Sequence, residues 1–222
     1  MSLKFNTKNS YLIALLGILT YITCIGVGMF FFAGGTKDNP NLRGYTFWFN
    51  TLSDLGRVTA YSGRANLISM ILFSIAYLTI AIAMIPFYLA FPYLFENTTY
   101  GKRLTKLGGF LGIVSSVGFI GVVLTPADIL YAPHMFFAIM AYVAILFMSV
   151  AYTTALYMND HFENYYTYLL SIFCLIFFVF LMMALTSLTL GVRSLLTIGQ
   201  KIGRISILVC YSILIYKSSK LV

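Results

Sequence analysis

The last apolar stretch of the chain carries the polar side chains best placed to do chemistry. Four polar residues recur there at intervals of i, i+4, i+7 and i+11: Arg193, Thr197, Gln200 and Arg204. These intervals place all four on one face of a helix, and Lys201 lies beside that face. The uncharged remainder, residues 205–216, has only twelve residues, which is too few to cross a bilayer. A spanning helix must therefore include Gln200, Lys201 and Arg204.

A cation at the centre of a bilayer costs about 2.5–3.5 kcal/mol on insertion scales. Lys201 and Arg204 are therefore expected to face the interior of a bundle, a water-filled cavity or an anionic partner. The alternative is that both long side chains snorkel to the lipid headgroups. Gly199 and Gly203, which are four residues apart, predict close approach of another helix and so favour the buried arrangement.

The chain has only six Asp and Glu residues, and two of them are predicted to meet the start of this helix. Asp54 lies in the segment Leu52–Gly56, and Asp128 follows Pro126 shortly before His134. If the chain has six spans, these loops lie at the same end as Arg193. An Asp with a His can supply acid–base chemistry for hydrolysis or acyl transfer. The predicted catalytic residues are Asp54, Asp128 and His134.

The predicted site holds more cations than carboxylates, which favours an anionic ligand. Arginine suits the geometry of a phosphate group, and the anion expected at this depth is a lipid phosphate. The predicted substrate-binding residues are Arg57, Arg193, Gln200, Lys201 and Arg204.

Each of these acidic and basic groups also has a structural explanation. In the structural explanation, Ser53 or Asp54 caps a short interfacial helix. Asp128 then ends a span and caps a turn, and His134 is an interfacial residue. Two Asp and one His could hold a metal, but their spacing matches no motif, so no metal site is predicted. No haem-binding histidine pair or nucleotide loop stands out, and no cofactor is predicted. His161 is predicted to lie at the opposite end, in solvent.

These side chains need elements that cross a membrane to position them. Of the 222 residues, 60% are hydrophobic and 9% are charged, whereas soluble domains carry about 25% charged residues. Runs of 18 or more apolar residues can cross a hydrocarbon core about 30 Å thick. We therefore predict an all-α fold, a polytopic bundle of six transmembrane helices in one domain (residues 1–222) of a multi-pass cell-membrane protein. The predicted spans are about 11–33, 67–91, 107–125, 134–158, 166–190 and 192–216.

The net charge of +8 comes from cations near the ends of apolar runs. This distribution is typical of membrane flanks and not of nucleic-acid binding, so no nucleic-acid partner is predicted. A basic loop with Lys102, Arg103 and Lys106 favours an orientation with both termini in the cytoplasm. The first long loop holds an aromatic group that is expected to lie at the membrane interface: Tyr45, Phe47, Trp48 and Phe49. The three cysteines lie inside apolar runs without CxxC spacing, which predicts buried free thiols.

The segment Asn50–Gly56, the stretch from Gly121 to Asp128 and the following His134 together resemble a family of prokaryotic membrane proteins. This is domain-of-unknown-function family 998, which is similar to the eukaryotic Frag/DRAM/Sfk proteins. The Gln200-Lys201 pair also fits, and the resemblance covers the chain from Asn50 onward. The resemblance implies a six-helix fold and a site at Asp54, Asp128 and His134. Some Frag-related proteins are linked to lipid-anchor remodelling and others to membrane stress responses, but the resemblance does not imply catalysis.

Three functions from different classes follow from these features. The first is a protein that binds, or binds and modifies, a lipid or another amphipathic anion at the outer end of the bundle, with membrane lipids as partners. The second is a non-catalytic subunit of a larger complex, with membrane-protein partners, because the loops are small and two helix faces carry small residues. The third is a small transporter, although the span interiors lack the acidic residues that proton coupling often uses.

Overall fold

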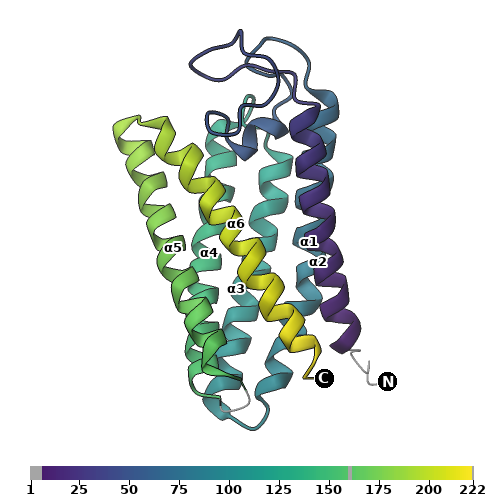
Figure 1. The fold of residues 1–222 in the computed structure, drawn as a ribbon, viewed down its shortest axis with the longest axis vertical. Coiled ribbons are helices and arrows are strands. Elements are labelled where there is room, and N and C mark those ends of the chain that lie inside the picture. The colour runs from purple at the N-terminus through teal and green to yellow at the C-terminus, as the bar shows by residue number, and fades with distance from the viewer. Residues whose placement is uncertain (1–6, 160–161, 222) are drawn as a thin grey trace.

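Six long helices form one bundle in the computed structural model (Figure 1), which describes residues 7–159 and 162–221; His161 lies outside them. Among the described residues, every regular element is helical. The elements are α1 (Thr7–Phe30), η1 (Leu52–Gly56), α2 (Leu67–Ala90), η2 (Phe91–Phe95), α3 (Thr99–Leu124), α4 (Tyr131–Tyr157), α5 (Asn164–Leu190) and α6 (Arg193–Ser219). All six long helices are long and apolar enough to cross a membrane, with α2 and η2 counted together as one span. The predicted all-α, six-span fold is confirmed, and the chain is a multi-pass membrane protein.

The predicted start of span three, residue 107, is wrong. Helix α3 begins at Thr99, so Lys102 and Arg103 lie near its start and not in a loop. Lysine and arginine are good helix formers, and their long side chains can reach headgroups from a helix end. The α-helix of span two ends at Ala90, close to the predicted residue 91, and η2 continues the span to Phe95. Pro92 lies in the first turn of η2, where a missing N–H costs little.

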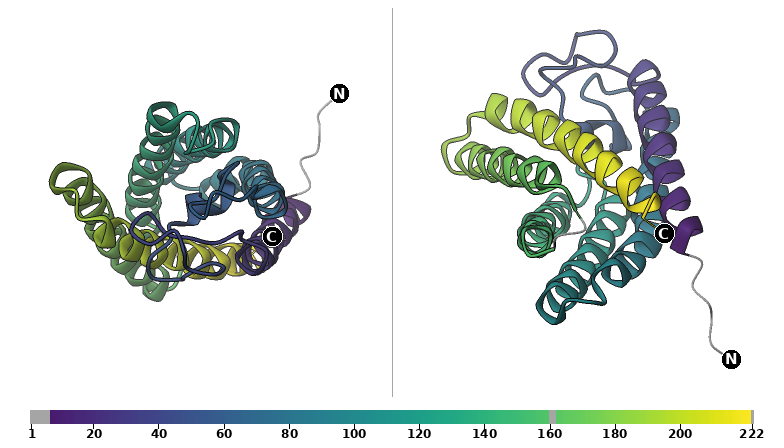
Figure 2. Two further views of the ribbon diagram at one scale, coloured as in Figure 1. Left: turned by 90° about the horizontal axis from the view of Figure 1, so that it is seen from above. Right: turned by 60° about the horizontal axis from the view of Figure 1, so that its bottom comes forward.

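Helix α1 begins and α6 ends at the same end of the bundle, as an even number of spans requires (Figure 1). Residues 31–66, which include η1, cover the opposite end, and we refer to it as the loop end. The turn between α5 and α6 also lies there. Gly191 ends α5 with φ of +72°, a left-handed conformation that glycine adopts without steric cost. Seen from above, the loop lies over the end of the bundle (Figure 2). Which side of the membrane this end faces stays a prediction.

Small residues let the helices approach closely where the sequence predicts it. A Cβ added at Gly112 would lie 2.7 Å from the ring of Tyr88 on α2, and one added at Gly203 would lie 2.7 Å from Phe180 on α5. Such distances are too short for real side chains, so only glycine fits. Close packing at the predicted pair, Gly199 and Gly203, is confirmed, and it holds α6 against α5. Gly112 lets α3 approach α2 in the same way.

Candidate functional site

A cavity of about 380 Å³ lies at the loop end, between α4, α5, α6 and the loop that contains η1. Its volume falls in the range of small-molecule sites, about 300–1,000 Å³. We refer to it as the loop-end cavity. Its charged and strongly polar lining comes from the loop and the helix ends: Lys37, Thr51, Ser53, Asp54, Arg57, Tyr61, His134, Arg193 and Gln200. Its apolar lining comes mainly from α4 and α5: Met135, Ala138, Ile139, Phe180, Leu181, Ala184 and Leu188.

Asp54 is buried in this cavity wall and holds two elements together. Its carboxylate accepts the backbone N–H of Thr51 at 2.8 Å, and the Thr51 hydroxyl accepts the N–H of Asp54 at 3.1 Å. This capping box fixes η1. The same carboxylate accepts Nη2 of Arg193 at 3.0 Å, which ties η1 to the start of α6. The alternative that Asp54 helps to cap a short helix is therefore confirmed, although Thr51 is the N-cap residue.

Gln200 and Lys201 are buried and attach the loop to α6. Oε1 of Gln200 accepts the backbone N–H of Leu52 at 2.8 Å. Nζ of Lys201 donates to the carbonyl oxygen of Asn50 and, at 3.2 Å, to that of Thr197. Both side chains point into protein, so the structure supports the buried arrangement and not snorkelling. Gln200 lines the loop-end cavity, whereas Lys201 lines a groove on the α1 side of α6.

His134, in the first turn of α4, is also buried. Its Nδ1 lies 2.7 Å from the carbonyl oxygen of Thr125. A carbonyl oxygen only accepts, so Nδ1 carries the proton and Nε2 of the neutral imidazole is an acceptor. Nε2 has no hydrogen-bond partner among the described residues. His134 thus brings an unused acceptor to the lining of the cavity.

Asp128 makes contacts with the long loop. Its carboxylate accepts the backbone N–H groups of Val58 at 3.1 Å and Thr59 at 2.9 Å. It therefore fastens the long loop to the connection between α3 and α4, and it is not among the residues that line the cavity. The structure brings two of the three predicted catalytic residues, Asp54 and His134, to the lining of one cavity and leaves Asp128 outside it.

Arg57 and Tyr61 lie at the polar part of the cavity. Nε of Arg57 donates to the carbonyl of Thr59 at 3.1 Å, and its guanidinium lies 4.0 Å from the centre of the Tyr61 ring. Among the described residues no carboxylate pairs with Arg57. Burial, and then the charge of Asp54, raises the pKa of Tyr61 above its ordinary value.

The lining carries an excess of positive charge. Three cations, Lys37, Arg57 and Arg193, face one carboxylate, Asp54, so the excess is 3 − 1 = 2 with neutral histidine. Lys37 and Tyr61 were not predicted as site residues. Their part in the site depends on how the long loop folds over the bundle, and no local pattern around either residue indicates it.

Arg204 lies deeper and does not line the loop-end cavity. Its Nη2 donates to the hydroxyl oxygens of Tyr77 at 3.1 Å and Tyr142 at 3.0 Å. Four rings, those of Tyr21, Tyr77, Phe119 and Tyr142, surround its guanidinium at 4.7–5.5 Å from the ring centres. We call this group the aromatic cage. The structure confirms that Arg204 faces the interior, but it separates Arg204 from Arg57 and Arg193.

No protein-family model, curated protein or solved structure matches this chain. The resemblance to the prokaryotic six-helix family therefore stays a prediction. Within residues 7–159 and 162–221, no group of three or more His, Cys, Asp and Glu side chains is placed to hold a metal ion. What the fold and the cavity define is a class: a six-span helical membrane protein with an amphipathic cavity at one end.

Proposed function

We propose that the protein binds an anionic amphipathic lipid in the loop-end cavity. The observation that carries this proposal is the division of the lining into a cationic part at the loop and an apolar part along α4 and α5. A lipid has the same division between headgroup and acyl chain. The proposed location is the cell membrane, which supplies such lipids, and the family resemblance, itself a proposal, is compatible with this function.

In the proposed complex, the headgroup lies near Arg57, Arg193 and Lys37. Arg57 and Lys37 are more available to it than Arg193, because Arg193 is already paired with Asp54. A guanidinium presents parallel N–H donors that match the oxygens of a phosphate. The acyl chain lies against Ala184 of α5 and its apolar neighbours on α4.

The proposal concerns binding and not a reaction. Nε2 of His134 is free to accept a proton or a hydrogen bond from a ligand. The carboxylate that lines the cavity, Asp54, is held by Thr51 and Arg193. A positioned histidine without a second available acid or base supports recognition of a headgroup better than it supports hydrolysis.

Native mass spectrometry of the protein, extracted gently from its own membrane, tests this proposal. We expect a retained lipid in the native protein and its loss in Ala184→Phe, because the added ring fills the apolar part of the cavity. Gly26→Phe is the matched control: an added Cβ there meets no atom within 4 Å, and α1 contributes no residue to the cavity. Retention of the same lipid in all three proteins would contradict the proposal. Protein partners without a specific lipid would favour the accessory-subunit hypothesis instead.

The charge of the headgroup is tested by Arg57→Gln, with Arg103→Gln, an exposed cation on α3, as the control. Loss of one charge-assisted contact weakens binding by about tenfold. We expect this loss for anionic lipids added to delipidated protein, and little change for zwitterionic lipids. Equal losses of affinity for both lipid types would show that Arg57 does not distinguish anionic from zwitterionic headgroups.

A further inference from the structure

Arg204 carries a buried positive charge and does not line the loop-end cavity. It lies eleven residues after the first residue of α6, about 16 Å along the helix axis, and its side chain is 4% exposed. A buried cation is costly unless it is paired. No described carboxylate forms an ion pair with Arg204. The carboxylate of Asp54 pairs with Arg193 at the start of α6 instead.

The guanidinium also has donors that protein does not use. It carries five N–H groups, and both of its hydrogen bonds, to Tyr77 and Tyr142, are made through Nη2. Nε is buried and has no partner among the described residues. The rings of the aromatic cage stabilise the cation by about 2 kcal/mol or more when desolvated, but they leave this donor unsatisfied.

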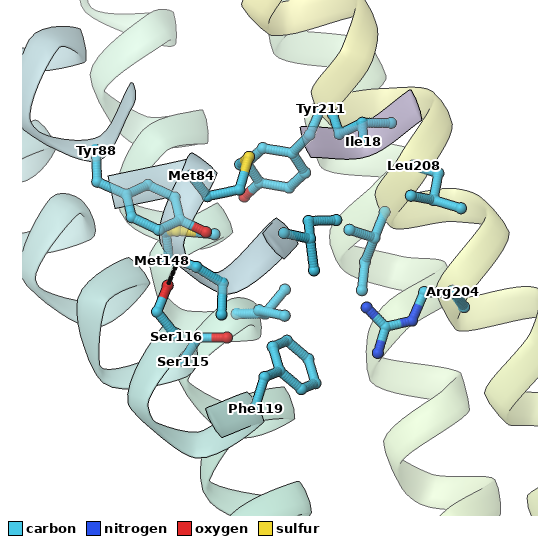
Figure 3. A pocket seen from close by; sticks show the side chains of 14 residues that line it. Ile18, Met84, Tyr88, Ser115, Ser116, Phe119, Met148, Arg204, Leu208 and Tyr211 are labelled. Carbon is cyan, nitrogen blue, oxygen red and sulfur yellow. Dashed lines mark hydrogen bonds between the residues drawn. The ribbon is translucent and has the colours of Figure 1, made fainter. Parts of the chain in front are cut away.

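A second, smaller cavity lies beside Arg204 in the core of the bundle. Its volume is about 30 Å³, enough for one water-sized particle. Figure 3 shows the Arg204 side chain pointing from α6 toward Phe119 and Ser115, and the Ser115 hydroxyl pointing into the same space. The neighbouring Ser116 hydroxyl is already used, because it donates to the carbonyl of Ala81 at 2.8 Å. This core cavity shares no lining residue with the loop-end cavity.

We propose that the core cavity binds a single halide ion, chloride under physiological conditions, held by the Arg204 guanidinium and the Ser115 hydroxyl. A monoatomic anion offsets the buried charge and accepts the unused N–H donors, whereas a water molecule supplies only a dipole. The volume suits a single monoatomic ion and excludes phosphate and sulfate. The remaining lining is largely apolar, so the ion is desolvated and its attraction to the guanidinium is strong.

The site has an approach from the loop end. A groove of about 190 Å³ on the α1 side of α6 is lined by Lys201 and Arg204. Arg204 and Leu208 line both the groove and the core cavity, so these two side chains lie between the groove and the proposed ion. Lys201 places a second positive charge along this approach, which favours entry of anions and disfavours entry of cations.

The test uses the full-length protein in nanodiscs of zwitterionic lipid. Its thermal unfolding midpoint is measured in sodium chloride, sodium bromide and sodium gluconate at equal ionic strength. Binding to the folded state alone stabilises it by mass action, so we expect the midpoint to rise with halide concentration and to saturate, relative to gluconate. Equal midpoints of the native protein in chloride and gluconate would overturn the proposal.

Variants locate the ion. Ser115→Val, which removes one donor while keeping a similar volume, should raise the apparent halide Kd about tenfold. Arg204→Met should abolish the halide response, whereas Arg103→Met, an exposed cation, should leave it intact. A native-like response in Ser115→Val would overturn the assignment. If Arg204→Met does not fold, anomalous diffraction from bromide-soaked crystals decides: a peak beside Arg204 supports the site, and its absence contradicts it.

Discussion

The positive charges of Arg193 and Arg204, on the inner face of α6, are stabilised in different ways. Arg193, at the loop end, pairs with the carboxylate of Asp54 beside a cavity of about 380 Å³. Arg204, deeper in the same helix, is surrounded by aromatic rings and two phenolic hydroxyls, and its cavity is about 30 Å³. Near a helix end, a loop can fold back and bring a carboxylate. At depth only other helices are within reach, and a span can carry tyrosine more easily than a charge.

This difference also separates two kinds of binding. The loop-end cavity joins charges to apolar helix surface, which suits an amphipathic molecule. The core cavity is small and has a single cation with unused donors, which suits one small anion. The two cavities have no lining residue in common, although Tyr142, which lines the loop-end cavity, also accepts a hydrogen bond from Arg204. Changes away from Tyr142 that disturb one region should therefore leave the other intact.

The largest effect is expected from Asp54→Ala. It removes the cap of η1 and leaves Arg193 without its partner, and breaking such a buried pair costs about 3 kcal/mol. The unfolding free energy in detergent should fall by that amount, while the halide dependence of the unfolding midpoint should persist. Asp38→Ala, at an exposed carboxylate of the same loop, is the control. Equal stability of the two variants would show that the loop is not fastened through Asp54.

A smaller effect is expected from Asp128→Ala. It removes the acceptor of two backbone N–H groups, and because this contact is exposed the loss should be about 1 kcal/mol. Amide exchange should accelerate at Val58 and Thr59, and lipid retention should stay as in the native protein. Loss of the lipid without faster exchange at these amides would mean that Asp128 takes part in the site directly.

Much of the architecture could be predicted from the sequence because lipid restricts the choice so strongly. Long apolar runs in a membrane must be helical, so five of the six spans follow from their lengths. The sixth follows because its apolar run is too short to cross a bilayer alone and must extend through Gln200, Lys201 and Arg204. The start of α3 was missed because apolarity marks where lipid begins, and a helix can extend beyond that point through Lys102 and Arg103. Burial of Lys201 and Arg204 could be predicted from the cost of a cation at depth.

The division of the α6 residues between two cavities could not be predicted. Residues 200, 201 and 204 are close in sequence, but each faces a different neighbour, and the choice depends on which helices pack on each side of α6. Two signals were present nonetheless. Thr51 and Asp54 have capping-box spacing, which predicts a short helix. Tyr77 and Tyr142 lie inside apolar runs, where a hydroxyl needs a polar partner, and Arg204 is that partner.

The central claim, that the loop-end cavity takes an amphipathic lipid, is tested most directly by photo-cross-linking. An anionic phospholipid with a diazirine in its acyl chain is added to the protein in nanodiscs, and adducts are mapped by peptide mass spectrometry. Adducts should concentrate at residues 135–139 of α4 and 180–188 of α5, and unlabelled anionic lipid should compete them away. Adducts spread evenly over the lipid-facing sides of α1, α3 and α5, without competition, would contradict the account.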